Sequence, residues 1–116
     1  MDKVCIVGGL RSFIGVEKGV YKHLTAEEIG ADVLRALLNK YKISENDIDG
    51  IIVGNSVGGC GNPARLLTLE AGLPENISAL TVDTQCGSGL EAMAIAAAKI
   101  EAGLGDLFIA GGAESC

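Results

Sequence analysis

The sequence predicts an α/β fold in which a mixed, mainly parallel sheet is covered by helices. Short β-rich apolar runs alternate along the chain with longer segments of helical periodicity, in the order β-α-β-α-β-α-β. Such alternation is typical of strands joined by right-handed crossover helices. The 116 residues correspond to a single domain, and 17 glycines permit close packing of a core built from Ala, Val, Ile and Leu.

The first half of the chain supplies two strands and one long helix. Val4 to Val7 is a short apolar run that predicts the first strand. Thr25 to Glu28 has the spacing of a capping box, which predicts the start of a helix. Apolar residues then recur at helical spacing as far as Tyr41, with polar residues on the other side, so this helix covers the sheet. Ile51 to Val53 predicts the second strand.

The second half supplies two further helices and two further strands. Pro63 suits the first turn of a short helix, and Gly72 suits its C-terminal end. Ala79 to Val82 predicts the third strand and Leu107 to Ala110 the fourth. Between them, residues 87 to 102 form an Ala-rich helix that is closed by Gly103 and apolar on all sides. A helix of this kind is expected to be buried in the middle of a larger structure.

Composition argues against several classes of partner. The net charge of −6 offers no basic surface for nucleic acid. The longest strictly apolar run, Ala92 to Ala98, is far shorter than the roughly 20 residues of a membrane helix, so no membrane association is expected. The N-terminus has no signal-peptide pattern, and the scattered cysteines contain no CxxC pair. We therefore expect a cytoplasmic protein with reduced cysteines.

Two glycine clusters and one group of polar residues are weak site candidates. In residues 8 to 13, Leu and Phe stand where a dinucleotide fingerprint needs glycine. Gly54 and Gly59 have P-loop spacing, but Cys60-Gly61 replaces the Lys and Ser/Thr that would hold phosphate and magnesium. His23 and the acidic residues at positions 45, 47 and 49 are expected to be solvated. No metal site and no cofactor-binding residue is predicted.

Cys86 differs from the other cysteines because of its position. It lies between a predicted strand end and a predicted helix start, where free N–H groups and the helix dipole favour a thiolate. Gly87 and Gly89 leave a path to the sulfur for a bulky substrate. Cys86 is therefore either a nucleophile or a buried thiol, and the chain supplies no dedicated base beside it. The inert, buried alternative is the expectation for Cys5, Cys60 and Cys116.

Several short motifs, in matching order and spacing, resemble the thiolase family, which comprises the acetyl-CoA acetyltransferases and 3-ketoacyl-CoA thiolases. They run through nearly the whole chain: Val4 to Val7 followed by Arg11-Ser12-Phe13-Ile14-Gly15, Gly54-Asn55, Asn62-Pro63-Ala64-Arg65, Cys86-Gly87-Ser88-Gly89-Leu90-Glu91-Ala92, and Ala110-Gly111-Gly112-Ala113-Glu114-Ser115. Each motif alone is weak evidence, whereas the combination is specific.

The resemblance implies that Cys86 accepts an acyl group from a CoA thioester, and that its backbone N–H lines an oxyanion hole. It also implies ping-pong acyl transfer between acyl-CoA and CoA as substrates, with no further cofactor. Such enzymes form homodimers and often tetramers.

Length limits what the resemblance can imply. A complete thiolase has two related halves and an inserted loop domain, so residues 1–116 are expected to be an incomplete N-terminal thiolase-like domain. The family's activating histidine, its second catalytic cysteine and most of its CoA-binding surface belong to the missing part. We expect the isolated chain to be inactive unless a complementing polypeptide supplies that part. Two alternatives remain open: a non-catalytic interaction or dimerisation module derived from a thiolase, and a related condensing enzyme of the ketoacyl or hydroxymethylglutaryl synthase type.

Overall fold

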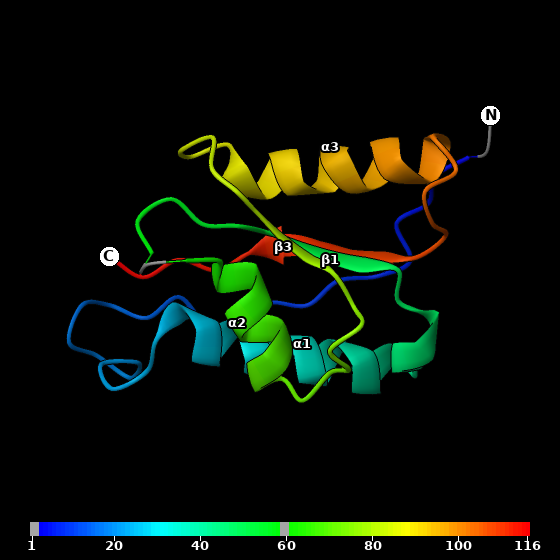
Figure 1. Ribbon diagram of the computed structural model, residues 1–116. Helices are drawn as coiled ribbons and strands as arrows, with labels where there is room; N and C mark the ends of the chain where they lie inside the picture. Colours follow the sequence, from blue (N-terminus) through cyan, green and yellow to red (C-terminus); the bar gives the residue numbers. More distant parts are fainter. Residues whose placement is uncertain (1–2, 59–60) are drawn as a thin grey trace.

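The computed structural model describes residues 3 to 58 and 61 to 116, which form three layers (Figure 1). The elements are α1 (Ala26–Tyr41), a 3-10 turn (Glu45–Asp47), β1 (Gly50–Gly54), α2 (Pro63–Glu70), β2 (Ala79–Val82), α3 (Ser88–Glu101) and β3 (Phe108–Gly112). The three strands form one parallel sheet in the order β2-β1-β3. Helix α3 covers one face of this sheet, and α1 and α2 cover the other (Figure 1).

The central strand β1 divides the core into two clusters. Its side chains alternate, so Ile51 and Val53 pack toward α1 and α2, where Leu34 and Leu67 are also buried. Ile52 points to the other face and packs against α3. All five residues of β1 are buried, as expected for a parallel strand covered on both faces.

The ends of the helices agree with the signals in the sequence. The capping box predicted at Thr25 is formed: its side chain accepts a hydrogen bond from the N–H of Glu28, whose carboxylate accepts one from the N–H of Thr25. Gly72 and Gly103 follow α2 and α3 with φ of 79° and 76°, the left-handed conformation that glycine adopts at little cost. These three predictions are confirmed.

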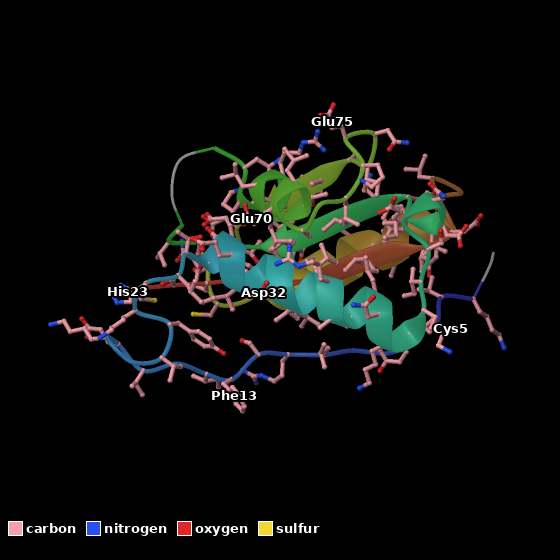
Figure 2. The ribbon with its side chains drawn as sticks, turned by 90° about the horizontal axis from the view of Figure 1, so that it is seen from below. Cys5, Phe13, His23, Asp32, Glu70 and Glu75 are labelled. Atoms are coloured by element: carbon pink, nitrogen blue, oxygen red, sulfur yellow. The ribbon has the colours of Figure 1, made fainter. Side chains whose placement is uncertain are left out.

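The strand predicted at Val4 to Val7 is not formed, and that prediction is wrong. The segment runs extended alongside α1, on the β3 side of the sheet (Figure 2). Ile6 and Val7 are 79% and 73% exposed. Its described hydrogen bonds to the body of the fold join the N–H and carbonyl of Gly9 to the hydroxyl of Tyr41. A β-rich run becomes a strand only when a neighbouring strand pairs with it, and within the described residues none does.

Within the described residues, helix α3 is buried on the side that faces the sheet and exposed on the other, so its expected burial in the middle of a larger structure stays a prediction. Ala92 and Ala96 face the sheet and are buried, whereas Leu90 and Met93 are 74% and 41% exposed. Its apolar composition therefore exceeds what packing within this chain requires. Even so, no helix among the described residues combines the length and the apolar character needed to span a bilayer.

A carboxylate fastens the loop that leads into β3. Asp49, just before β1, accepts hydrogen bonds from the backbone N–H groups of Asp106 at 2.6 Å and Leu107 at 3.1 Å. These two bonds, first that from Asp106, hold the pKa of Asp49 below its usual range. Asp49 is exposed, as expected for the acidic residues of this turn, but its carboxylate has a structural role that the sequence did not indicate.

Replacing Asp49 by asparagine is expected to lower the urea midpoint of unfolding at about pH 7. A depressed native pKa stabilises the fold above the unfolded-state value of 3.8, and this stabilisation is lost as the pH falls through the lowered value. The difference between Asp49→Asn and the parent chain should therefore shrink as the pH falls below 3.8. Asp47→Asn is the matched control, since the carboxylate of Asp47 accepts no hydrogen bond from the described residues. A difference that stays the same as the pH falls would contradict this account.

Candidate active site

Three loops meet where the parallel strands end. They follow β1 (residues 55 to 58), β2 (residues 83 to 87) and β3 (residues 113 to 116), and they lie together on the left of Figure 1. Because parallel strands all point the same way, their carboxyl ends share one edge of the sheet. Ligands of open α/β sheets characteristically bind outside this edge. The geometry thus places the turn that carries Cys86 where a site is expected.

Cys86 lies in the tight turn between β2 and α3. Gly87 is the N-terminal cap of α3, so the cysteine directly precedes the cap, and its side chain is exposed. Among the described residues, the N–H of Cys86 donates no hydrogen bond, which leaves it available to an incoming oxygen. A Cβ atom added at Gly89 would meet nothing within 4 Å, so the space beside the turn is open. The thiol is accessible rather than buried.

The residue before the cysteine has an unusual backbone. Gln85 has φ of 56°, a left-handed conformation that costs a non-glycine residue about 1 kcal/mol. Both of its backbone groups are held by side chains: Asp83 accepts from its N–H at 3.0 Å, and the hydroxyl of Ser88 donates to its carbonyl at 2.6 Å. Ser88 is buried and also accepts from the N–H of Thr84 at 3.0 Å. These contacts fix the conformation of the turn.

The loop after β1 is hydrogen-bonded to the other two loops. The hydroxyl of Ser56 donates to the carboxylate of Asp83 at 2.7 Å and lies 3.0 Å from the hydroxyl of Ser88. On its other side, the carboxylate of Glu114 accepts from the N–H of Ser56 at 2.9 Å and of Val57 at 3.0 Å. The Ser56 hydroxyl, followed by the N–H of Gln85, holds the pKa of Asp83 below its usual range. Asp83 is thus a charged acceptor at neutral pH.

Gly54, the last residue of β1, allows the turn to lie close to the strand. A Cβ atom at this position would come within 2.6 Å of the carbonyl carbon of Ser88 and 2.8 Å of the nitrogen of Gly89. Both are backbone atoms at the start of α3, so no side-chain rotation could relieve the contact. Glycine is required at this point because the helix N-terminus packs directly on the strand end.

The Asn62 to Arg65 motif has a structural role next to these loops. The side chain of Asn62 caps α2 by accepting from the N–H of Arg65, and it donates to the carbonyl of Ala79 on β2. The guanidinium of Arg65 donates to the carbonyls of Ile77 at 2.9 Å and Glu75 at 3.1 Å. The motif therefore fixes α2 and the loop before β2, and through them the strand that leads to Cys86.

The other sequence-based expectations about single residues have mixed outcomes. Cys5 and Cys116 are exposed, so the prediction that they are buried is wrong; Cys5 lies on the segment that does not join the sheet. Cys60, also expected to be buried, lies outside the described residues. His23 is exposed, as expected for a solvated loop residue. In the parts of the chain that the structure describes, no His, Cys, Asp or Glu residues cluster as metal ligands would.

Sequence reasoning did not single out Ser56, Asp83 or Glu114 as site residues. Each follows a strand by one to a few positions, so their proximity arises only when three strands align in parallel. The available signal was a small or acidic polar residue directly after each apolar run.

Comparison with known proteins places this arrangement in a family of acyltransferases. A family model described as "Thiolase, N-terminal domain" matches residues 4–116. The chain therefore belongs to the thiolase family, as its motifs indicated, and its three-layer α/β fold agrees with that membership.

Individual relatives agree with the family match. The chain is 44% identical over 110 residues to YhfS of Bacillus subtilis, which is named as a candidate acetyl-CoA C-acetyltransferase; the match covers 95% of this chain and 29% of that protein. It is 42% identical over 115 residues to VraB of Staphylococcus aureus, which bears the same designation, covering 99% and 30%. A crystal structure of the Bacillus anthracis acetyl-CoA acetyltransferase superposes with a TM-score of 0.81 at 30% identity, covering 84% of this chain and 25% of that one. The chain thus spans less than a third of the length of these relatives.

Proposed function

We propose that this chain supplies the nucleophile of a thiolase-type acyltransferase, and that Cys86 is that nucleophile. The observation that carries the proposal is the placement of an exposed cysteine directly before the cap of α3, at the carboxyl edge of a parallel sheet. The names of the relatives support acetyl-CoA as a substrate. Membership of the thiolase family supports acyl transfer as the reaction class.

In the proposed reaction, the thiolate of Cys86 attacks the carbonyl carbon of an acyl-CoA. The Cys86 thiol first loses its proton to a base that the completing polypeptide would supply. A new carbon–sulfur bond then forms to Cys86, the bond to the CoA sulfur breaks, and the same proton passes to that sulfur, so that CoA leaves as a thiol. The oxygen carries negative charge while the carbon is tetrahedral, and the free N–H of Cys86 is one donor that would stabilise it. The acyl group then passes to its acceptor: CoA in the degradative direction, or the carbanion of a second acyl-CoA in the synthetic direction.

We infer that residues 1–116 perform this role as the N-terminal part of a larger assembly, and not alone. The large exposed apolar side chains support this inference, because isolated domains seldom leave so many uncovered. On the extended N-terminal segment, Phe13 (Figure 2) and Ile14 are 84% and 80% exposed, and on α3 Leu90 is 74% exposed. Among the described residues, no side chain is hydrogen-bonded to the Cys86 thiol as a base would be, so activation of the thiol would come from the completing polypeptide. The assembled enzyme would act in the cytoplasm as a homo-oligomer.

The proposal is tested by mass spectrometry of tryptic peptides after incubation with acetyl-CoA. In the complete enzyme, meaning this chain together with the polypeptide that completes the thiolase fold, we expect an acetyl group on Cys86, its release by added CoA, and no adduct in Cys86→Ser. The isolated chain should acquire no adduct. An acetyl group on another cysteine, or none in the complete enzyme, would overturn the assignment and favour a non-catalytic interaction module. Transfer from an acyl carrier protein in preference to CoA would favour the condensing-enzyme alternative.

A further inference from the structure

We propose that Ser56 is a positioning residue for Cys86: its hydroxyl joins the loop after β1 to the turn that carries the nucleophile. The proposal rests on the proposed role of Cys86. The resemblance assigns no role to Ser56, which lies on a different strand end from the cysteine, 30 positions earlier in the chain.

The hydrogen bonds around Ser56 favour one arrangement of protons. The Ser56 hydroxyl oxygen lies 2.7 Å from Asp83 Oδ1, 3.0 Å from the Ser88 hydroxyl and 3.2 Å from the Gln85 carbonyl oxygen, so its contact with Asp83 is the shortest. Two hydroxyl protons, from Ser56 and Ser88, are available for two acceptors, the Asp83 carboxylate and the Gln85 carbonyl. The shortest contacts assign them without conflict: Ser56 donates to Asp83 at 2.7 Å, and Ser88 donates to Gln85 at 2.6 Å. The lone pairs of Ser88 remain free to accept from the N–H of Thr84. Every polar group in this cluster is then satisfied, which makes it rigid.

This rigidity acts on the one strained residue of the turn. A left-handed non-glycine residue such as Gln85 persists only when its surroundings hold it. Asp83 holds its N–H, and Ser56 in turn fixes the carboxylate of Asp83. Without the hydroxyl of Ser56, that carboxylate would be free to rotate, and the peptide between Gln85 and Cys86 would sample other orientations. The sulfur would then spend less time at the N-terminus of α3.

Glu114 fixes the backbone of Ser56 by hydrogen bonds that do not involve the turn carrying Cys86. Its carboxylate accepts from the backbone N–H groups of Ser56 and Val57, so the loop after β1 is fastened to the loop after β3. Asn55 adds a second bond, donating to the carbonyl of Ala113 at 2.7 Å. Ser56 therefore approaches Asp83 from a fixed support, which is the condition for a positioning residue as opposed to a side chain that merely fills space.

The test is the rate at which iodoacetamide alkylates Cys86 in the 116-residue chain, with Cys5 and Cys116 as exposed internal references in the same sample. Ser56→Ala is expected to slow the alkylation of Cys86 about two- to fivefold, which corresponds to the free energy of interactions at a helix N-terminus. The alkylation rates of Cys5 and Cys116 should be unchanged. Ser56→Thr keeps the hydroxyl and should restore the rate. Ser78→Ala, an exposed serine at the opposite end of the sheet, is the matched control.

A double-mutant cycle with Asp83→Ala separates a linked pair from two independent effects. If Ser56 acts through Asp83, the double variant should be no slower than the slower single variant. Three outcomes would each overturn the proposal. The first is a double variant whose rate reduction is the product of the two single reductions. The others are equal slowing of alkylation at Cys86, Cys5 and Cys116, and equal slowing of Cys86 alkylation by Ser56→Ala and Ser56→Thr. Should Ser56→Ala fail to fold, Asp83→Ala alone tests the same link, because it removes the oxygen that accepts from both Ser56 and Gln85; selective slowing of Cys86 alkylation is expected, and an unchanged rate counts against the proposal. Because no CoA is present, this result is independent of whether Cys86 accepts an acetyl group.

Discussion

Replacing Cys86 by serine in the complete enzyme is expected to lower acyl transfer by at least about 10⁴-fold, because every cycle passes through a bond to that sulfur. A thiolate is a strong nucleophile near neutral pH, whereas a serine hydroxyl needs a dedicated base, and the part of the chain that the structure describes shows none hydrogen-bonded at position 86. The fold should be unaffected, since Cys86 is exposed and belongs to neither core cluster. The measurement is the rate of CoA-dependent cleavage of acetoacetyl-CoA, together with the melting temperature.

Cys5→Ser is the matched control for that experiment. Cys5 is exposed, and it lies on the extended N-terminal segment, outside the three loops of the candidate site. Cys5→Ser should keep its activity within about twofold of the parent, since exposed substitutions away from a site have small effects. If Cys86→Ser retained substantial activity, or if both variants lost it alike, Cys86 would not be the nucleophile.

The elements of this fold that the sequence predicts well are those with local causes. The capping box at Thr25 and the glycines after α2 and α3 act through residues within one helical turn, so neighbouring residues are enough to place the ends of these helices. The position of Cys86 before α3 followed from the same reasoning, since a strand end and a helix start can both be located from local signals.

The predictions that failed depend on contacts between distant segments. Val4 to Val7 has the composition of a strand, but it becomes one only if another strand pairs with it. No strand among the described residues pairs with it. The exposure of Cys5 has the same cause. The links among Ser56, Asp83 and Glu114 also join residues far apart in the chain, so composition and spacing could not reveal them. Local sequence thus located the candidate nucleophile, while its supporting network required the fold.

Replacing Gly54 by alanine is expected to destabilise the fold by about 2 kcal/mol, which lowers the melting temperature by roughly 10 °C. The added methyl group would lie 2.6 Å from the backbone of Ser88, so either the start of α3 or the end of β1 must move. Because α3 begins two residues after Cys86, this displacement should also disturb the turn that carries the thiol. The measurements are thermal unfolding by circular dichroism and the iodoacetamide rate of Cys86.

Gly111→Ala provides a control for Gly54→Ala within the same sheet. Gly111 lies on β3 beside Val53, and a Cβ atom there would meet nothing within 4 Å. An alanine at Gly111 should therefore be neutral or slightly stabilising, since it reduces the freedom of the unfolded chain without a clash. A similar loss of stability in both variants would mean that any side chain is unfavourable on these strands, and that the contact with α3 is not the cause. If only Gly54→Ala lowers the melting temperature and slows the alkylation of Cys86, the close contact between β1 and α3 is what holds the turn of Cys86 in place.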